Sequence, residues 1–376
     1  MHGSEALWYY RATGSAHSEP LSGLGQLAIR STKEVPIETN DIYVKLLQRL
    51  KYPNLTSEYL LAIMRRLITP EEGVLLLELP AEPADLAQKL GLHEDTIRRK
   101  LQELMEKGVI IGTSKGLRLV RDVIQFHDAS LSSSEKWVDT DLLEMWKGLY
   151  EAELFPFMKT ISTIPVDPYV QNVRVVPAWK AIERSPNISV AELRPEENLR
   201  ELIRGADVIA VIPCTCRRSL KRCNAKLECC VQFNRGAEYA IGRGAGRKIS
   251  ADEAMAIFKE AEEAGLVHTW PFAASSRLNE ICNCCIDCCI ILDGGIKFGT
   301  IGRTLARSHL RADVNQEICD GCQDCVERCF FEAIEMKKTP STKKLKATVD
   351  VGKCFGCGVC AVACDLHAIR MKLHQP

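Results

Sequence analysis

The sequence predicts a multidomain α+β protein, and three observations lead to this. All eighteen cysteines fall between Cys214 and Cys364, so the chain divides into a cysteine-free part and a cysteine-rich part. Before that boundary, the segment 69–122 has the pattern helix, turn, helix and hairpin. Near the end, two stretches that each contain four cysteines repeat one another. A chain of 376 residues is long enough for two or three domains.

The front of the chain predicts a winged helix-turn-helix. Residues 1–38 carry Gly, Ser, Thr and His without periodicity, and we expect a weakly ordered extension there. Helical spacing of apolar residues begins at Asp41. The later elements are two helices that meet at Gly91 and a hairpin: Pro83–Leu90, His93–Lys107, Val109–Ile111 with Leu117–Val120. This order is that of a winged helix-turn-helix, which we place at 39–125, followed by a helical connector over 126–207.

The end of the chain contains an internal duplication. Residues 319–336 and 354–371 are offset by 35 positions and identical at eight of eighteen, including all four cysteines of each stretch. Each stretch reads C-x2-C-x2-C-x3-C, which resembles the bacterial ferredoxin pattern for two [4Fe–4S] clusters. Zinc is the alternative, but it prefers two pairs of cysteines to this three-plus-one run. We expect a ferredoxin-like dicluster domain over 311–376.

The resemblance implies which cysteines serve each cluster, because in this family the fourth cysteine of a run ligates the other cluster. The implied ligands of the first cluster are Cys319, Cys322, Cys325 and Cys364. Those of the second are Cys354, Cys357, Cys360 and Cys329. Phe330 and Asp365 stand where the family usually has proline after the fourth cysteine. We also expect that cysteine to begin a short helix, Ile334 and Ile369 to cover the clusters, and 337–346 to form a basic loop.

Ten further cysteines lie in a predicted α/β metal-binding domain, residues 208–310. They are Cys214, Cys216, Cys223, Cys229, Cys230, Cys282, Cys284, Cys285, Cys288 and Cys289. Three interpretations stay open: one or two additional iron–sulfur clusters, which we favour, a zinc site, or a redox-active thiol pair. The first allotment uses Cys214, Cys216, Cys223 and Cys229 or Cys230 for one centre. It uses Cys282, Cys284, Cys285 and Cys288 or Cys289 for the other. A mixed arrangement that draws on both groups is the alternative.

Other residues near these cysteines suggest supporting roles. The basic residues Arg217, Arg218, Lys221 and Arg222 either form a solvated face or offset the charge of thiolate ligands. We expect His268 to be a packing residue rather than a ligand. The G-x-G-x-G run at 242–246 follows a helical stretch instead of a strand, which argues against a nucleotide site.

The whole chain from about residue 40 resembles a group of iron–sulfur proteins of anaerobic bacteria and archaea. The matching residues are Pro213–Arg217, with the pattern PCxCR, and Cys282–Cys289, with the pattern CxCCxxCC. The resemblance implies electron transfer with a redox partner protein, without naming a substrate.

Charge and hydropathy reduce the number of functional classes to which this protein could belong. The chain has 49 basic and 49 acidic residues, and no apolar run approaches the roughly 20 residues of a membrane helix. The N-terminus lacks the plan of a secretion signal, so we expect a cytoplasmic protein that does not insert into membranes. The function predicted is electron transfer, as the electron-input component of an anaerobic oxidoreductase.

The alternative function is a redox-sensing transcription regulator that reads DNA through Arg98, Arg99 and Gln102. Residues 60–125 hold ten basic and ten acidic side chains, whereas DNA-binding domains usually have a basic face. Nucleic-acid binding is therefore not favoured.

Overall fold

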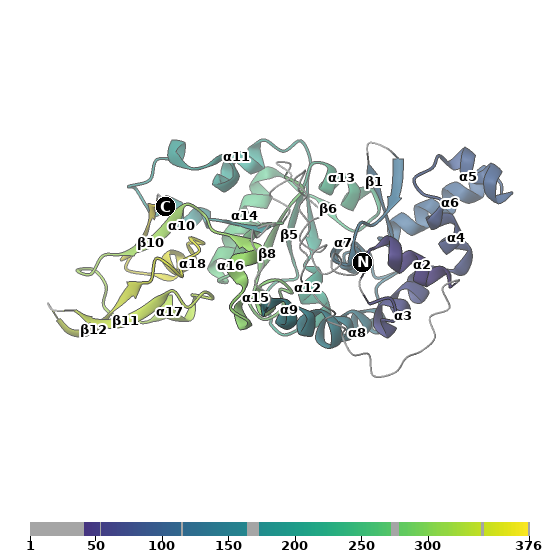
Figure 1. Ribbon diagram of the computed structural model, residues 1–376. Helices are drawn as coiled ribbons and strands as arrows, with labels where there is room; N and C mark the ends of the chain where they lie inside the picture. Colours follow the sequence, from purple (N-terminus) through teal and green to yellow (C-terminus); the bar gives the residue numbers. More distant parts are fainter. Residues whose placement is uncertain are drawn as a thin grey trace, which may run out of the picture. The chain divides into compact units, whose positions relative to one another are not determined.

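The computed structural model describes residues 41–52, 54–113, 116–163, 173–271, 278–339 and 342–374. Helices and strands are mixed, as the sequence predicts. The chain forms two compact units: Met1–Leu154 with Arg243–Ala245, and Phe155–Gly242 with Gly246–Pro376 (Figure 1). The predicted connector, 126–207, is shared between these units, and the predicted extension, 1–38, lies outside the described residues. No helix in the described segments is both long enough and apolar enough to cross a membrane.

The first unit is helical with one small hairpin. Its helices are α2 (Ile42–Arg49), α3 (Glu58–Leu67), α4 (Pro70–Leu77), α5 (Pro83–Leu90), α6 (Glu94–Glu106), α7 (Val123–Leu131) and α8 (Thr140–Leu149), followed by the π-helix η1 (Tyr150–Leu154). The hairpin consists of β1 (Ile110–Thr113) and β2 (Gly116–Leu119), paired antiparallel. Helix α5 ends at Gly91, whose φ of 65° is left-handed. The predicted order of helix, turn, helix and hairpin is present.

One buried ion pair ties α4 to the end of α6. The ammonium of Lys107 donates to both carboxylate oxygens of Glu72, at 2.8 and 3.1 Å, and the two side chains are 9% and 3% exposed. Glu72 also accepts from the backbone N–H of Thr69, which completes a capping box at the start of α4. Removing one partner leaves an uncompensated charge in the core.

We therefore expect Lys107→Met to lower the free energy of unfolding of this unit by about 3–5 kcal/mol. The measurement is urea unfolding followed by tryptophan fluorescence, because Trp137 and Trp146 lie in this unit. The matched control is Lys89→Met, which removes an exposed pair with Glu78 and should cost about 1 kcal/mol or less. Equal losses of stability in the two variants would contradict the claim that the buried Glu72–Lys107 pair stabilises this unit more than an exposed pair does.

The second unit is built on a seven-stranded sheet in the order β6-β4-β5-β8-β7-β3-β9. All neighbours are antiparallel except β3 and β9. The strands are β3 (Val173–Val176), β4 (Ile209–Pro213), β5 (Glu228–Phe233), β6 (Arg247–Lys248), β7 (Val267–Pro271), β8 (Glu280–Cys284) and β9 (Leu305–Ala306). The helices around them are α9 (Phe155–Ser162), α10 (Trp179–Glu183), α11 (Leu199–Arg204), α12 (Thr215–Leu220), α13 (Arg235–Gly242), α14 (Ala251–Glu263), α15 (Leu292–Lys297) and α16 (Ile301–Thr304).

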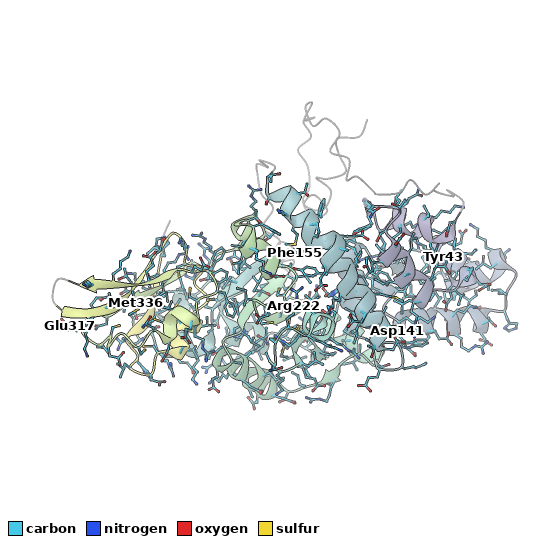
Figure 2. All side chains as sticks on the ribbon, turned by 90° about the horizontal axis from the view of Figure 1, so that it is seen from below. Tyr43, Asp141, Phe155, Arg222, Glu317 and Met336 are labelled. Atoms are coloured by element: carbon cyan, nitrogen blue, oxygen red, sulfur yellow. The ribbon has the colours of Figure 1, made fainter. Side chains whose placement is uncertain are left out.

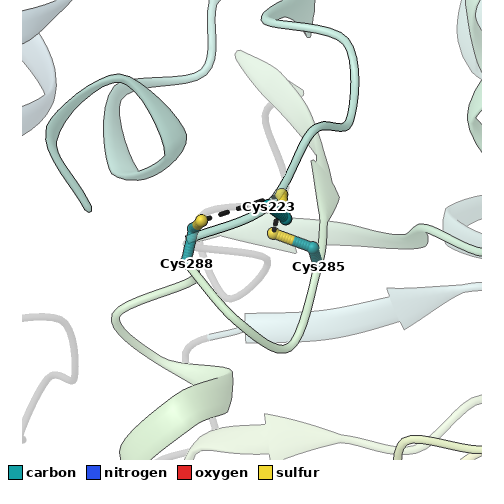
Figure 3. A group of neighbouring side chains, drawn as sticks. All are labelled: Cys223, Cys285 and Cys288. Carbon is teal, nitrogen blue, oxygen red and sulfur yellow. Dashed lines mark hydrogen bonds between the residues drawn. The ribbon is translucent and has the colours of Figure 1, made fainter. Parts of the chain in front are cut away.

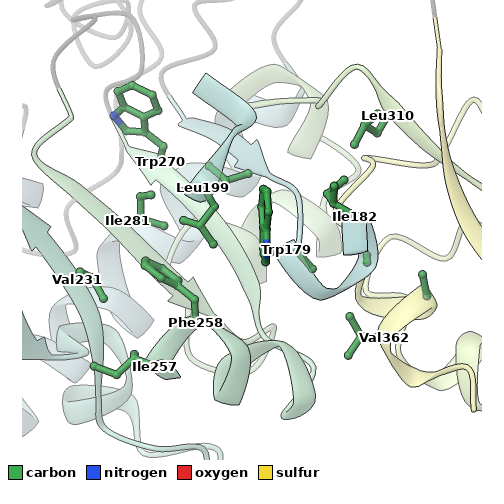
Figure 4. Close-up of a cluster of buried hydrophobic side chains, with 14 of the residues drawn as sticks. Trp179, Ile182, Leu199, Val231, Ile257, Phe258, Trp270, Ile281, Leu310 and Val362 are labelled. Carbon is green, nitrogen blue, oxygen red and sulfur yellow. The ribbon is translucent and has the colours of Figure 1, made fainter. Parts of the chain in front are cut away.

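A continuous hydrophobic core joins the sheet to the cysteine-rich end of the chain. Figure 4 shows Phe258 of α14 and Val231 of β5 in the same cluster as Trp179 of α10 and Val362 near the C-terminus. The backbone N–H of Ala178, just before α10, donates to the carbonyl of Cys357 at 2.9 Å. The predicted middle and C-terminal domains therefore share one core within this unit.

The last segment of the chain has the symmetry expected from the duplication. Strand β10 (Leu310–Val314) pairs antiparallel with β13 (Ile369–Leu373), and β11 (Ile334–Thr339) pairs with β12 (Thr342–Val349). Two short helices, α17 (Asp324–Glu327) and α18 (Val359–Ala363), lie between the pairs. Glu317 and Met336 mark this segment in Figure 2.

Two sequence expectations about this segment were wrong. The described residues of the expected basic loop, 337–339 and 342–346, belong to the strands β11 and β12, in which Lys337 pairs with Lys346. The fourth cysteine of each run does not begin a helix: Cys329 and Cys364 follow α17 and α18, and the helices begin beside the third cysteines. The Ala-Ile pairs lead into strands instead: Ile334 begins β11 and Ile369 begins β13. The pairing of these strands, rather than a helix, sets the backbone conformation there.

Candidate metal centres

The two C-terminal cysteine runs sit on matching turns. Gly321 and Gly356 have φ of 87° and 73°, and the residues just before the helices, Gln323 and Gly358, have φ of 77° and 82°. Positive φ reverses the chain within the C-x2-C-x2-C run and brings its three thiols to one side of the turn. Both turns are tightly packed, because a Cβ on Gly356 would lie 2.2 Å from the carbonyl oxygen of Leu310 and one on Gly321 would lie 2.3 Å from that of Leu345.

We expect Gly356→Ala to destabilise this turn by at least about 1–2 kcal/mol, the cost of a left-handed conformation for an L-residue, with the clash in addition. The iron bound by the anaerobically purified protein should fall together with its thermal stability. Gly242→Ala is the control, since a Cβ there meets nothing within 4 Å. An unchanged iron content in Gly356→Ala would contradict a ligand role for this turn.

Four C-terminal thiols line one apolar cavity. Cys354, Cys357 and Cys360 of the second run and Cys329 of the first all line this cavity. The other lining residues are Ala312, Phe331, Ala333, Ile334, Val349, Phe355, Gly358 and Val359. Four sulfurs in a cavity whose other lining residues are apolar are a donor set that fits an iron–sulfur cluster. Ile334, which we expected to cover a cluster, is among the lining residues, and Ile369 is not.

The other four thiols of the duplication, which do not line this cavity, are Cys319, Cys322, Cys325 and Cys364. Burial raises the pKa of Cys325 to about 11, and the neighbouring thiols of Cys322, Cys319 and Cys364 add to the increase. Cys325 is buried, whereas Cys322 is exposed. These four thiols could hold a second cluster, closer to solvent than the first.

Backbone N–H groups point at several of these sulfurs. The N–H of Ala333 donates to the Sγ of Cys329 at 3.3 Å, and those of Phe331 and Ile334 also donate to it. The N–H of Val359 donates to Cys357. Donors of this kind stabilise metal-bound thiolates and adjust the potential of a cluster.

A buried arginine lies beside the same cavity. Arg311 donates to the carbonyls of Ser308 and Leu310, both at 2.6 Å, while its Nε is buried without a partner among the described residues. Burial lowers the pKa of Arg311, and the nearby thiol of Cys354 opposes this shift. A cation with an unused N–H fits a site for an anionic thiolate cluster. Arg311 could not be singled out from the sequence, because a single arginine in a strand has no distinctive pattern.

Residues 318–368 match the family model of the 4Fe–4S dicluster domain. The C-terminal segment is a ferredoxin-like dicluster domain. The match covers both cysteine runs of the dicluster domain and none of the middle cysteines. Comparisons with curated proteins and with solved structures gave no significant match.

The ten middle cysteines lie on strands of the seven-stranded sheet, on the turns beside them and, for Cys216, on α12. Strand β4 leads directly into Cys214, and the left-handed Lys221 at the end of α12 turns the chain toward Cys223. Strand β5 carries Cys229 and Cys230, and β8 carries Cys282 and Cys284. None of the ten forms a disulfide.

Seven of these thiols form a connected group, which we call the thiol array. Its members are Cys229, Cys214, Cys230, Cys282, Cys284, Cys289 and Cys216, each within hydrogen-bonding contact of a neighbour. Hydrogen bonds from Cys282, Cys289 and the Thr269 hydroxyl outweigh burial and lower the pKa of Cys284 to about 6. The neighbouring thiol of Cys229 and burial raise the pKa of Cys214 to about 11. Such a group could hold metal, but its sulfur pattern does not single out four ligands.

The other three thiols form a separate group, which we call the three-thiol site. The Sγ of Cys223 lies 3.5 Å from that of Cys285 and 3.7 Å from that of Cys288 (Figure 3). Cys285 and Cys288 are buried, and Cys223 is partly exposed. The allotment of Cys223 to a centre with Cys214 and Cys216 is therefore not what the structure shows. The structure instead brings Cys223 close to two cysteines of the later group, Cys285 and Cys288.

Arg217 lies between the two groups. Its guanidinium donates to the Sγ of Cys229 at 3.0 Å and to the carbonyls of Lys226 and Asn283 at 2.6 and 3.1 Å. It also donates to Cys285, and its side chain is 3% exposed with Nε unpartnered in the described structure. Burial alone would lower the pKa of Arg217, but the thiols around it hold that pKa far above the usual value. Of the two readings of the basic cluster, Arg217 fits charge compensation.

His268 is fully hydrogen-bonded. One ring nitrogen contacts the amide oxygen of Asn283 at 2.5 Å and the other the carboxylate of Glu262 at 3.1 Å. Glu262 also accepts from the N–H groups that begin α10. His268 is therefore a structural residue. Through Glu262 and His268, a link that sequence reasoning missed, α10 is connected to β7 and, by Asn283, to the cysteine-bearing strand β8.

Proposed function

We propose that this chain is an iron–sulfur electron-transfer protein that supplies electrons to, or receives them from, a redox partner. The observation that carries the proposal is the apolar cavity of the dicluster domain, where Cys329 of one run lies with three thiols of the other. When bound, [4Fe–4S] clusters take up and release single electrons.

The proposed ligands follow the grouping of the thiols. Cys354, Cys357, Cys360 and Cys329 hold the buried cluster, and Cys319, Cys322, Cys325 and Cys364 hold the other. Around the first, Phe331 and Phe355, whose rings stack with centroids 4.3 Å apart, exclude water. Arg311 offsets negative charge at its edge. The exposed Cys322 gives the second cluster the shorter distance to an external partner.

We propose that the thiol array holds a further iron–sulfur centre, which makes the middle region the internal partner of the dicluster domain. The connection between the two is short, because Ala178 bonds Cys357 and Gly358 packs against Ala181 within the shared core. This arrangement suits an electron-input component of an oxidoreductase in an anaerobic, cytoplasmic setting, with the redox partner docking at the dicluster domain.

The winged-helix assignment of the first unit supports partner docking better than DNA binding. On α6, Arg98 is paired with Glu94, and Gln102 contacts Glu106 at 3.4 Å. Two of the three residues that would read bases are thus engaged by acidic neighbours on their own helix, beside a charge-balanced surface.

The test is metal analysis of the full chain purified without oxygen. The proposal predicts about eight irons for the dicluster domain and about twelve or more if the thiol array is loaded. Iron near eight with one or two zinc ions would disprove a middle iron–sulfur centre, and iron near zero would disprove the proposed function. A salt-dependent, sequence-specific gel shift that changes on oxidation would favour the transcription-regulator alternative.

A further inference from the structure

The three-thiol site has the geometry of a single-ion site. Zinc binds thiolates at about 2.3 Å in a tetrahedron, which places two ligand sulfurs about 3.8 Å apart. The observed Sγ separations of 3.5 and 3.7 Å match this spacing. A covalent disulfide is excluded, because its sulfurs lie about 2.05 Å apart.

The dicluster domain provides an internal comparison. Its thiols bind separate irons of a cube, so they must lie farther apart than the ligands of one ion. No three of its eight thiols, all of them described, lie within 4.8 Å of one another, whereas those of the three-thiol site do. The same structure therefore contains two different sulfur spacings, and the closer one suits a mononuclear centre.

The surroundings of the three sulfurs are those of a metal–thiolate site. Each sulfur accepts a backbone N–H: Cys223 from Ala225, Cys285 from Cys288, and Cys288 from Arg222 at 3.3 Å. The Cys285–Cys288 pair lies on a tight turn, with the C-x2-C spacing common in zinc sites. The buried guanidinium of Arg217, which also donates to Cys285 and Cys223, offsets the excess negative charge of three thiolates.

We propose that Cys223, Cys285 and Cys288 bind one zinc ion, separate from the iron–sulfur centres. Among the described residues, no fourth cysteine, histidine or carboxylate has a ligand atom within the same 4.8 Å. A bound water occupies the fourth position, on the side of the partly exposed Cys223. Zinc sites with three protein ligands and a water are of the type that binds and polarises small ligands.

Two pairs of adjacent cysteines, Cys284–Cys285 and Cys288–Cys289, each have one member in the three-thiol site and one in the thiol array, so the array member serves as the control. Cys285 belongs to the three-thiol site and its neighbour Cys284 to the thiol array, and the same holds for Cys288 and Cys289. Cys285→Ala and Cys288→Ala should each reduce zinc from about one ion per full-length chain to near zero without loss of iron. Cys284→Ala and Cys289→Ala should retain the zinc.

A loss of about four irons in Cys285→Ala, or retention of its zinc, would overturn the proposal. X-ray absorption at the zinc edge of the unmodified chain tests it without any substitution. Three sulfur ligands at about 2.3 Å and one oxygen are expected, and four sulfur ligands or an absence of zinc would contradict the site. These zinc measurements are independent of the iron content that tests electron transfer.

Discussion

Cys329→Ala and Cys354→Ala are expected to remove the same cluster, although the two residues lie in different repeats. Each single variant should lose about four of the irons of the dicluster domain, because each lacks one ligand of one cube. Combining them should remove no more, since the second substitution acts on a site that is already empty. Combining Cys329→Ala with Cys322→Ala should instead remove about eight.

The measurement is iron per chain, made without oxygen on variants whose circular dichroism matches that of the parent. It distinguishes crossed ligand sets from an arrangement in which each repeat ligates its own cluster. The physical basis is the cavity that Cys329 shares with the second run. If each repeat ligated its own cluster, Cys329→Ala would add nothing to Cys322→Ala and would double the loss caused by Cys354→Ala. That outcome would contradict the crossed ligand sets.

Arg217→Met is expected to have the largest effect of any substitution outside the cysteines. The almost fully buried guanidinium donates to the sulfurs of Cys229, Cys285 and Cys223 and to two carbonyls, so its removal leaves these acceptors without this donor and the thiolates without a counter-charge. Loss of one partner of a buried charged network costs about 3–5 kcal/mol. We expect a matching fall in the free energy of unfolding, with loss of metal from the middle region and retention of the eight irons of the dicluster domain.

Arg217→Lys should lose stability and metal as Arg217→Met does. A lysine ammonium cannot replace the planar guanidinium, which donates to several acceptors at once. The control is Arg204→Met, since the Arg204 side chain is 65% exposed and pairs only at the surface with Glu201. Chemical unfolding and metal analysis of the same samples provide both readouts. A stability within about 1 kcal/mol of the parent and full metal content would show that Arg217 is not the charge compensator.

Local patterns in the sequence predicted much of this fold. Pro83, Gly91 and the duplicated cysteines act through neighbouring backbone, so the bounds of α5, the hairpin after α6 and the extent of the dicluster domain followed from them. The β11–β12 hairpin was missed because its lysines suggest solvent, whereas its pairing depends on inward residues such as Ile334 and Ala347.

The grouping of the middle cysteines could not be predicted from spacing. Cys223 and Cys285 are 62 positions apart, and their contact depends on how β5, β8 and the turn after α12 assemble. Adjacent cysteines such as Cys284 and Cys285 were allotted to one centre because they are neighbours in sequence. In the structure they serve different groups, since adjacent residues at the end of a strand point to different sides.

The central claim is that the dicluster domain carries two clusters that exchange electrons. An anaerobic reductive titration of the full chain, followed by cluster absorption and by electron paramagnetic resonance, tests it most directly. The account predicts uptake of about one electron per cluster, hence two for this domain, and their release to an added one-electron acceptor. Protein that contains no iron, or that shows no reducible absorption while all eight cysteines are intact, would contradict it.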